Sequence, residues 1–111
     1  MSEFGARQRS VFVVDDHPIV RQGLVQLIEQ EPDLKVCGQA ADVKEARAGL
    51  SKAAPDIVIL DLSLRDSDGL ELVKDIRNKY QQLPVLVLSM HDENIYAERL
   101  LSAGANGYIM K

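Results

Sequence analysis

Short aliphatic runs alternate along the chain with longer segments in which apolar residues recur every three or four positions. Aliphatic runs of about four to eight residues are typical of buried parallel strands, and the longer recurrence is typical of amphipathic helices. The runs predict five strands, over residues 11–14, 34–40, 57–60, 85–88 and 107–110, with four helices between them. Regular alternation of this kind predicts an α/β fold, a doubly wound parallel sheet of five strands.

Several residues predict where the helices begin and end. Pro18 suits the first turn of the first helix, Asp42 is expected to cap the second, and Gly104 suits the end of the fourth. The third helix is predicted to begin at Asp68, and Gly38 to mark a turn in the second strand. The apolar residues at helical spacing are Val20, Leu24, Leu27 and Ile28, then Val43, Ala46 and Leu50, then Leu72, Val73 and Ile76, and finally Ala97, Leu100 and Leu101. The last three are expected to face inward.

The chain ends at Lys111, directly after the fifth predicted strand. Because a doubly wound sheet carries helices on both faces, we expect one face to hold only the first helix and to expose apolar strand surface. Residues 10–111 are therefore expected to be a domain without its fifth helix, cut from a longer protein, and residues 1–9 an N-terminal extension. Such a domain should be less stable than a complete one, or self-associate through its uncovered face.

Composition narrows the class of protein. A chain of 111 residues suits one domain, and 46% apolar with 27% charged residues indicates a globular chain. The net charge of −4 lacks the basic footprint of a nucleic-acid binder, so any DNA contact should belong to a separate domain. The single cysteine, Cys37, excludes an internal disulfide, fits a cytoplasmic protein and is predicted to be an unreactive strand thiol. No apolar stretch approaches the roughly 18 residues that cross a bilayer.

Polar residues follow four of the predicted strands. They are Asp15-Asp16, Asp61, Ser89 and Lys111. Since the carboxyl ends of parallel strands meet at one edge of a sheet, three carboxylates, a hydroxyl and an ammonium should lie together there. A carboxylate can accept a phosphoryl group covalently, and phosphoryl transfer depends mostly on positioning and charge neutralisation. The set therefore indicates phosphoryl-transfer chemistry.

The carboxylates predict a magnesium site. Asp15, Asp16 and Asp61 would repel one another unless a cation lay among them, and Mg²⁺ prefers hard oxygen ligands. The alternative is that Asp15 or Asp16 merely caps the first helix. Taken singly, Ser89 would be a turn residue and Lys111 a solvated one, so only their joint placement indicates a site.

This set of strand-end residues resembles the receiver domain of two-component response regulators, over residues 10–111. Residues 102–111 and the triplet Asp16-His17-Pro18 resemble the NarL/FixJ type. The resemblance implies a flavodoxin-like receiver fold and a phosphorylation-controlled signalling switch that is not a turnover enzyme. It also implies a sensor histidine kinase as partner and a LuxR-type helix-turn-helix output domain downstream, through which DNA is bound; a homodimer is compatible with it.

The resemblance also implies roles for particular residues. Asp61 would be the phosphoacceptor, and Lys111 would pair with the phosphoryl group. Ser89 would swing toward that group and Tyr108 would follow inward as the switch aromatic, although an aromatic in such a strand is more often plain core. Asp16, Asp61 and the backbone carbonyl of Ser63 would hold Mg²⁺, with Asp15 acting through water.

Three positions differ from, or vary within, the family pattern. Arg65 stands where the family often has proline, which affects the expected stiffness of the loop. Ser63 and His91 occupy positions that tune the lifetime of the phosphoryl group, and His17 is expected to be a turn residue at the helix start.

Two other functions fit the same residues. An aspartyl-phosphate phosphatase would usually need a second acid two residues after the nucleophile, where this chain has Ser63. A pseudo-receiver, an interaction module without phosphorylation, generally lacks one of the acidic pair, the acceptor or the lysine, and here all are present.

Overall fold

Five parallel strands form one sheet in the order β2-β1-β3-β4-β5. The computed structural model describes residues 8–61, 66–89 and 101–110, of which residues 66–69, 89 and 108–110 are described by their backbone only. The strands are β1 (Arg9–Val14), β2 (Leu34–Ala40), β3 (Ile57–Asp61), β4 (Val85–Ser89) and β5 (Gly107–Met110). All four pairings are parallel, so the doubly wound α/β sheet that the sequence predicts is confirmed.

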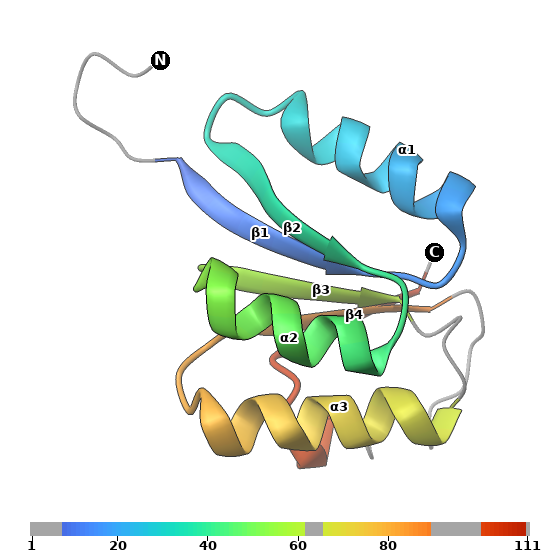
Figure 1. Cartoon of the computed structure of the whole chain (residues 1–111), viewed down its shortest axis with the longest axis vertical. Helices are drawn as coiled ribbons and strands as arrows, with labels where there is room; N and C mark the ends of the chain where they lie inside the picture. Colours follow the sequence, from blue (N-terminus) through green and yellow to red (C-terminus); the bar gives the residue numbers. More distant parts are fainter. Residues whose placement is uncertain (1–7, 62–65, 90–100, 111) are drawn as a thin grey trace.

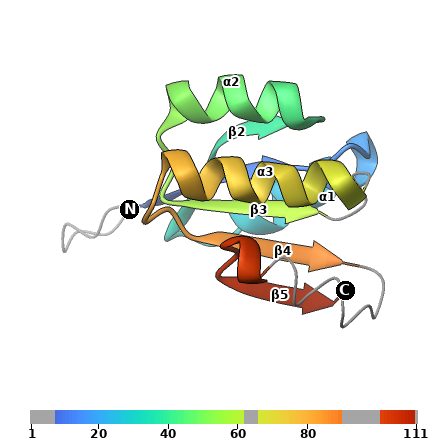
Figure 2. The same cartoon turned by 90° about the horizontal axis from the view of Figure 1, so that it is seen from below.

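Helices lie on both faces of this sheet (Figures 1 and 2). α1 (Pro18–Glu29) covers one face, and α2 (Val43–Ala53) and α3 (Asp66–Lys79) cover the other. Successive β1 side chains point to opposite faces. Val11 and Val13 pack with the α1 side, whereas Phe12 and Val14 belong to the larger core under α2 and α3. β1 is therefore buried on both faces, which explains its unbroken aliphatic sequence.

α2 has the ends that its sequence predicts. The Asp42 carboxylate accepts a hydrogen bond from the Glu45 backbone N–H at 2.8 Å, and the Glu45 carboxylate accepts one from the Ala41 N–H at 2.9 Å. The first bond satisfies a donor that the first helical turn leaves unpaired, and the second binds the residue before the N-cap to the helix. Ala54 then ends the helix in the left-handed conformation, with φ 46°.

The prediction of a turn at Gly38 is wrong, because β2 continues through it to Ala40. The pairing with β1 shifts there: Val11 lies opposite Val36 and Phe12 opposite Gly38, so Cys37 is passed over. A Cβ at position 38 would lie 2.6 Å from the Phe12 ring. The glycine therefore makes room for an aromatic side chain on the adjacent strand.

Two boundary predictions need correction. α3 begins at Asp66, two residues before the predicted start. Leu101, predicted to face inward, is 45% exposed, and the residue that packs against the core at this helix end is Ala103. Gly104 follows in a left-handed conformation, φ 125°, as a helix-terminating glycine should. Ala97 and Leu100 lie outside the described residues.

The face that carries α1 is incompletely covered, as expected. Ile19 is 83% and Leu27 63% exposed. An open apolar groove of about 530 Å³ runs between α1 and β4, lined by Val20, Gly23, Leu24, Leu27 and Leu88. Among the described residues α1 is the one helix on this face. No described helix has the length and apolar character to cross a membrane.

Candidate functional site

The polar strand ends meet at one edge of the sheet. β1 and β3 are neighbours with Val14 opposite Leu60, so Asp15, the next residue after β1, lies beside Asp61 at the end of β3. β3 pairs Asp61 with Leu88, and β4 ends at Ser89 beside Met110. The sheet therefore places the carboxyl ends of β1, β3, β4 and β5 at one edge. In the sequence, most of the predicted site residues lie at these strand ends or directly after them.

Two carboxylates at this edge are buried. Asp15 has no exposed surface and Asp61 is 1% exposed. Removing a charged carboxylate from water is unfavourable unless another group compensates its charge. Two such carboxylates on adjacent strands are therefore expected to draw positive charge to this edge.

The loop between β1 and α1 is held by both strand and helix. The Asp15 backbone N–H donates to the Ala40 carbonyl at 3.0 Å. Arg21, from α1, donates from Nη1 to the Asp15 carbonyl at 2.7 Å and from Nε to the Gln39 amide oxygen at 3.2 Å. Arg21 therefore joins the acidic loop to β2, a contact that residue type and spacing alone do not indicate.

Neither aspartate caps α1. The N-cap residue is His17, which makes no side-chain capping bond. The Asp15 carboxylate accepts a hydrogen bond from the His17 backbone N–H at 2.9 Å, and an Asp16 oxygen lies 2.9 Å from His17 Nδ1. The capping alternative is thus wrong, and His17 is a turn residue at the helix start, as expected.

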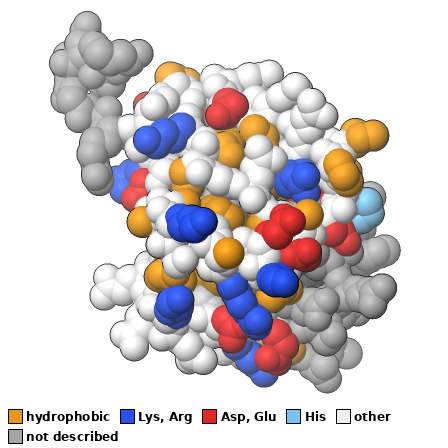
Figure 3. All heavy atoms as spheres, in the orientation of Figure 1, with side chains coloured by type: hydrophobic (Ala, Val, Ile, Leu, Met, Phe, Trp, Pro, Cys, Tyr) orange, Lys and Arg blue, Asp and Glu red, His pale blue; other side chains and the backbone are white. Residues whose placement is uncertain are grey.

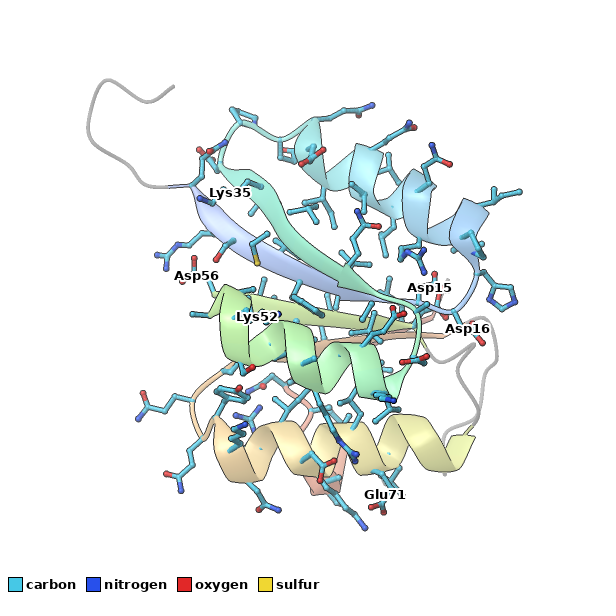
Figure 4. All side chains as sticks on the ribbon, in the orientation of Figure 1. Asp15, Asp16, Lys35, Lys52, Asp56 and Glu71 are labelled. Atoms are coloured by element: carbon cyan, nitrogen blue, oxygen red, sulfur yellow. The ribbon has the colours of Figure 1, made fainter. Side chains whose placement is uncertain are left out.

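His17 also belongs to the acidic cluster itself. Ligand atoms of Asp15, Asp16 and His17 all lie within 4.8 Å of one another, and the two labelled aspartates sit at the sheet edge where α1 begins (Figure 4). The adjacency of His17 to the acidic pair was the only sequence signal for this contact. The two aspartates supply hard oxygen donors of the kind that Mg²⁺ prefers, so the donor set fits that ion.

Other members of the predicted site lie wholly or partly beyond the described residues. Ser63, His91 and Lys111 fall outside them, and for Ser89 and Tyr108 only the backbone is described. Their predicted roles, and the sharing of a metal ion between Asp61 and the acidic pair, stay predictions.

The visible surface over α2 and α3 mixes both signs of charge (Figure 3). Arg47 of α2, for example, forms a salt bridge with Asp75 of α3. The described side chains of this face form no field of positive charge, in agreement with the net charge of the chain. A second pocket, of about 390 Å³, includes Asp56 and Pro84 just before β3 and β4, at the edge opposite the carboxylates.

Comparison with known proteins points to the same family as the pattern of strand-end residues. The family model of the response regulator receiver domain matches residues 11–111. The DNA-binding transcriptional activator DevR/DosR of Mycobacterium tuberculosis is 41% identical over 101 residues, covering 91% of this chain and 46% of the relative. The transcriptional regulatory protein UhpA of Salmonella typhimurium is 39% identical over 102 residues, covering 92% and 50%. The chain spans about half the length of these relatives.

Solved structures agree. A two-component response regulator of the LuxR family from Aurantimonas sp. SI85-9A1 superimposes with a TM-score of 0.88 at 38% identity, covering 94% of this chain and 74% of that one. The isolated REC domain of RcsB from Salmonella enterica serovar Typhimurium, solved with the phosphomimetic BeF3⁻, gives 0.85 at 29% identity, covering 95% and 78%. With a family model that matches from β1 to the last residue, the chain belongs to the response regulator receiver domain family, and its relatives are regulators of transcription.

Proposed function

We propose that this chain is a phosphorylation-controlled switch that accepts a phosphoryl group on Asp61. The observation that carries the proposal is the burial of Asp61 at the carboxyl end of β3, beside the buried Asp15 that directly follows β1. The donor is a phosphohistidine of a sensor kinase, and the output is a DNA-binding domain outside this chain, as the transcriptional relatives suggest. Such signalling belongs in the cytoplasm.

In the transfer step, an Asp61 carboxylate oxygen attacks phosphorus. An O–P bond forms while the N–P bond of the phosphohistidine breaks, and its electron pair returns to the imidazole nitrogen. The product is an acyl phosphate. Asp16, Asp61 and the Ser63 carbonyl would hold Mg²⁺, with Asp15 acting through water; the ion, when bound, would supply positive charge that offsets the charge of the phosphoryl group.

Other residues neutralise and read the new charge. Lys111 pairs with the phosphoryl group, and the Ser89 hydroxyl donates a hydrogen bond to it. Tyr108 follows Ser89 inward, which converts a local charge into a changed surface around β5. That surface is where the output domain, or a second copy of the chain, would detect phosphorylation.

The test is the intact mass of the protein after incubation with acetyl phosphate and Mg²⁺. We expect a single phosphoryl adduct that requires Mg²⁺ and is cleaved by hydroxylamine, as an acyl phosphate is. Asp61→Asn should abolish it. Asp75→Asn, which removes a partly exposed carboxylate on α3, is the matched control and should leave the adduct unchanged.

The competing functions predict other outcomes. A pseudo-receiver would give no adduct on a folded protein. A phosphatase would give a transient adduct with continuous release of inorganic phosphate from small phosphate esters. Either result would contradict the proposed function.

A further inference from the structure

Arg77, in the last turn of α3, joins the chain segments that lead into β4 and β5. Its Nε and Nη2 donate to the Gly104 carbonyl at 3.0 and 2.7 Å. Its Nη1 donates to the carbonyls of Tyr80 and Gln81 at 3.2 and 2.7 Å. Nη2 also donates to the Asn106 side-chain oxygen at 2.7 Å. All four acceptors are neutral oxygens, so the guanidinium serves here as a multidentate hydrogen-bond donor.

Asn106 connects this group of contacts directly to the sheet. Its side-chain oxygen accepts from the Val85 backbone N–H at 2.9 Å as well as from Arg77. Its own backbone N–H donates to the Val85 carbonyl at 2.8 Å. Asn106 therefore extends the β4–β5 hydrogen bonding by one position and links it to α3.

Gly104 fits this arrangement closely. A Cβ at position 104 would lie 2.7 Å from Arg77 Cγ, and the backbone φ of 125° is one that other residues rarely adopt. The side chain of Arg77 thus packs directly over the Gly104 backbone whose carbonyl it binds. The resulting unit, Arg77 with Gly104 and Asn106, is called here the β5 clamp.

The register of β5 is the one that these contacts would fix. The strand has four residues and lies at the edge of the sheet (Figure 2), where, among the described strands, it pairs only with β4. A one-residue slip of a strand shifts it by about 3.3 Å and turns every side chain to the opposite face. The observed register places Gly107 opposite Leu86, and Asn106 adjoins the first residue of that ladder.

We propose that Arg77 and Asn106 are positioning residues for the phosphoryl-transfer site, acting by fixing the register of β5. Lys111 follows the last residue of β5 in the sequence. The clamp therefore fixes, from the opposite end of a four-residue strand, the register of the strand that leads into this lysine. This inference rests on the proposed function, in which Lys111 pairs with the phosphoryl group.

The test uses conservative and disruptive variants of the clamp. Asn106→Ala removes the shared acceptor, whereas Asn106→Asp keeps an oxygen for both Arg77 and the Val85 N–H. Arg77→Lys keeps the charge but not the five-donor fork. Arg47→Ala, which removes the arginine that bridges α2 and α3, is the matched control.

Each variant is measured in three ways. Hydrogen exchange compares the amides of β5 with those of β1 and β3. Calorimetry gives the Mg²⁺ dissociation constant, and mass spectrometry gives the rate of phosphorylation by acetyl phosphate. We expect Asn106→Ala and Arg77→Lys to exchange about tenfold faster in β5 alone and to be phosphorylated at least about tenfold more slowly, since small misplacements of a reacting group have effects of that size.

The Mg²⁺ dissociation constant should stay unchanged in these variants, because the carboxylates lie at the ends of β1 and β3, away from β5. Asn106→Asp and Arg47→Ala should behave like the parent protein in all three measurements. Faster exchange in every strand, unchanged exchange in β5, or faster β5 exchange with an unchanged rate of phosphorylation would each overturn the inference. If the parent protein takes no phosphoryl group, the proposed function fails, and the positioning role fails with it. If the parent protein is phosphorylated and the clamp variants are phosphorylated at the same rate, the positioning role alone fails.

Discussion

Phe12 fills a space that two glycines leave open. Its ring lies under Gly38 of β2 and Gly49 of α2, where an added Cβ would come within 2.6 Å of ring carbons in both cases. Neither glycine adopts a positive φ, so backbone freedom does not account for either of them. Both are explained by the volume of one aromatic side chain.

This packing predicts opposite effects of one substitution at two helical glycines. Gly49→Ala should lower the free energy of unfolding by about 1–3 kcal/mol, because overpacking at Phe12 outweighs the better helix propensity of alanine. Gly23→Ala in α1, where nothing lies within 4 Å, should raise it by up to about 1 kcal/mol. Urea denaturation measures both.

A double variant supplies the control. Phe12→Leu should offset much of the effect of Gly49→Ala, because the smaller side chain makes room for the new methyl group. Equal effects of alanine at positions 23 and 49 would contradict this account.

The cysteine behaves as its sequence context suggests. Burial raises the pKa of the Cys37 thiol, and Sγ lies 3.5 Å from the Val11 carbonyl oxygen. A thiol with a raised pKa stays protonated at neutral pH and is a poor nucleophile. The prediction of an unreactive strand thiol therefore agrees with the structure.

Among the helices, α2 has a well-capped start and a strained end. Asp42 and Glu45 stabilise its start, while Ala54 at its end takes a left-handed conformation that usually favours glycine. Pro55 follows, and a helix cannot easily continue into proline. Ala54 therefore adopts a strained conformation at the turn that leads from α2 into β3.

We expect Ala54→Gly to raise the free energy of unfolding by about 0.5–1 kcal/mol. The gain from relieving the strained conformation is partly offset by the greater freedom of glycine in the unfolded chain. Ala53→Gly, one residue earlier and still helical, is the matched control and should lower stability by about 1 kcal/mol. Thermal and urea unfolding of the two variants should move in opposite directions, and a fall in both would refute the argument from strain.

For the whole molecule, the groove beside α1 is the feature with the largest physical consequence. Large aliphatic side chains in water are unfavourable, and contiguous apolar surface of this kind promotes association. The sequence predicts that the 111-residue chain is less stable than a complete domain or self-associates through its uncovered face. The second alternative has a specific location, between α1 and β4.

Sedimentation equilibrium tests that expectation. The chain should show a mass that rises with concentration, and Leu27→Lys should weaken association by at least about tenfold, or 1.4 kcal/mol. Its melting temperature should change little, because Leu27 is already 63% exposed. Gln26→Lys, which adds the same charge at an exposed position outside the groove lining, should leave association unchanged. A parent chain that stays monomeric would contradict the expectation.

The amino-acid pattern is enough to predict the strands, most helix ends and the edge of the sheet at which the predicted site residues lie. Aliphatic runs predict strands because their residues are buried on both faces, and the polar residues after those runs must meet at one edge because parallel strands share a direction. Asp42, Pro18 and Gly104 were interpretable because capping depends on a few adjacent residues. The family resemblance rests on the same local signals.

Side-chain contacts between segments distant in the chain could be identified only from the packed structure. The roles of Gly38 and Gly49 follow from Phe12, which lies on a different element in each case. Arg77 contacts Gly104 and Arg21 contacts Gln39, each on a segment far along the chain, and helical spacing did not predict that Leu101 is exposed. His17 joins the acidic pair through the geometry of one loop. Hydrophobic periodicity predicts which face of a helix or strand a residue occupies. The contacts described here depend instead on which atoms of other helices and strands lie opposite that face.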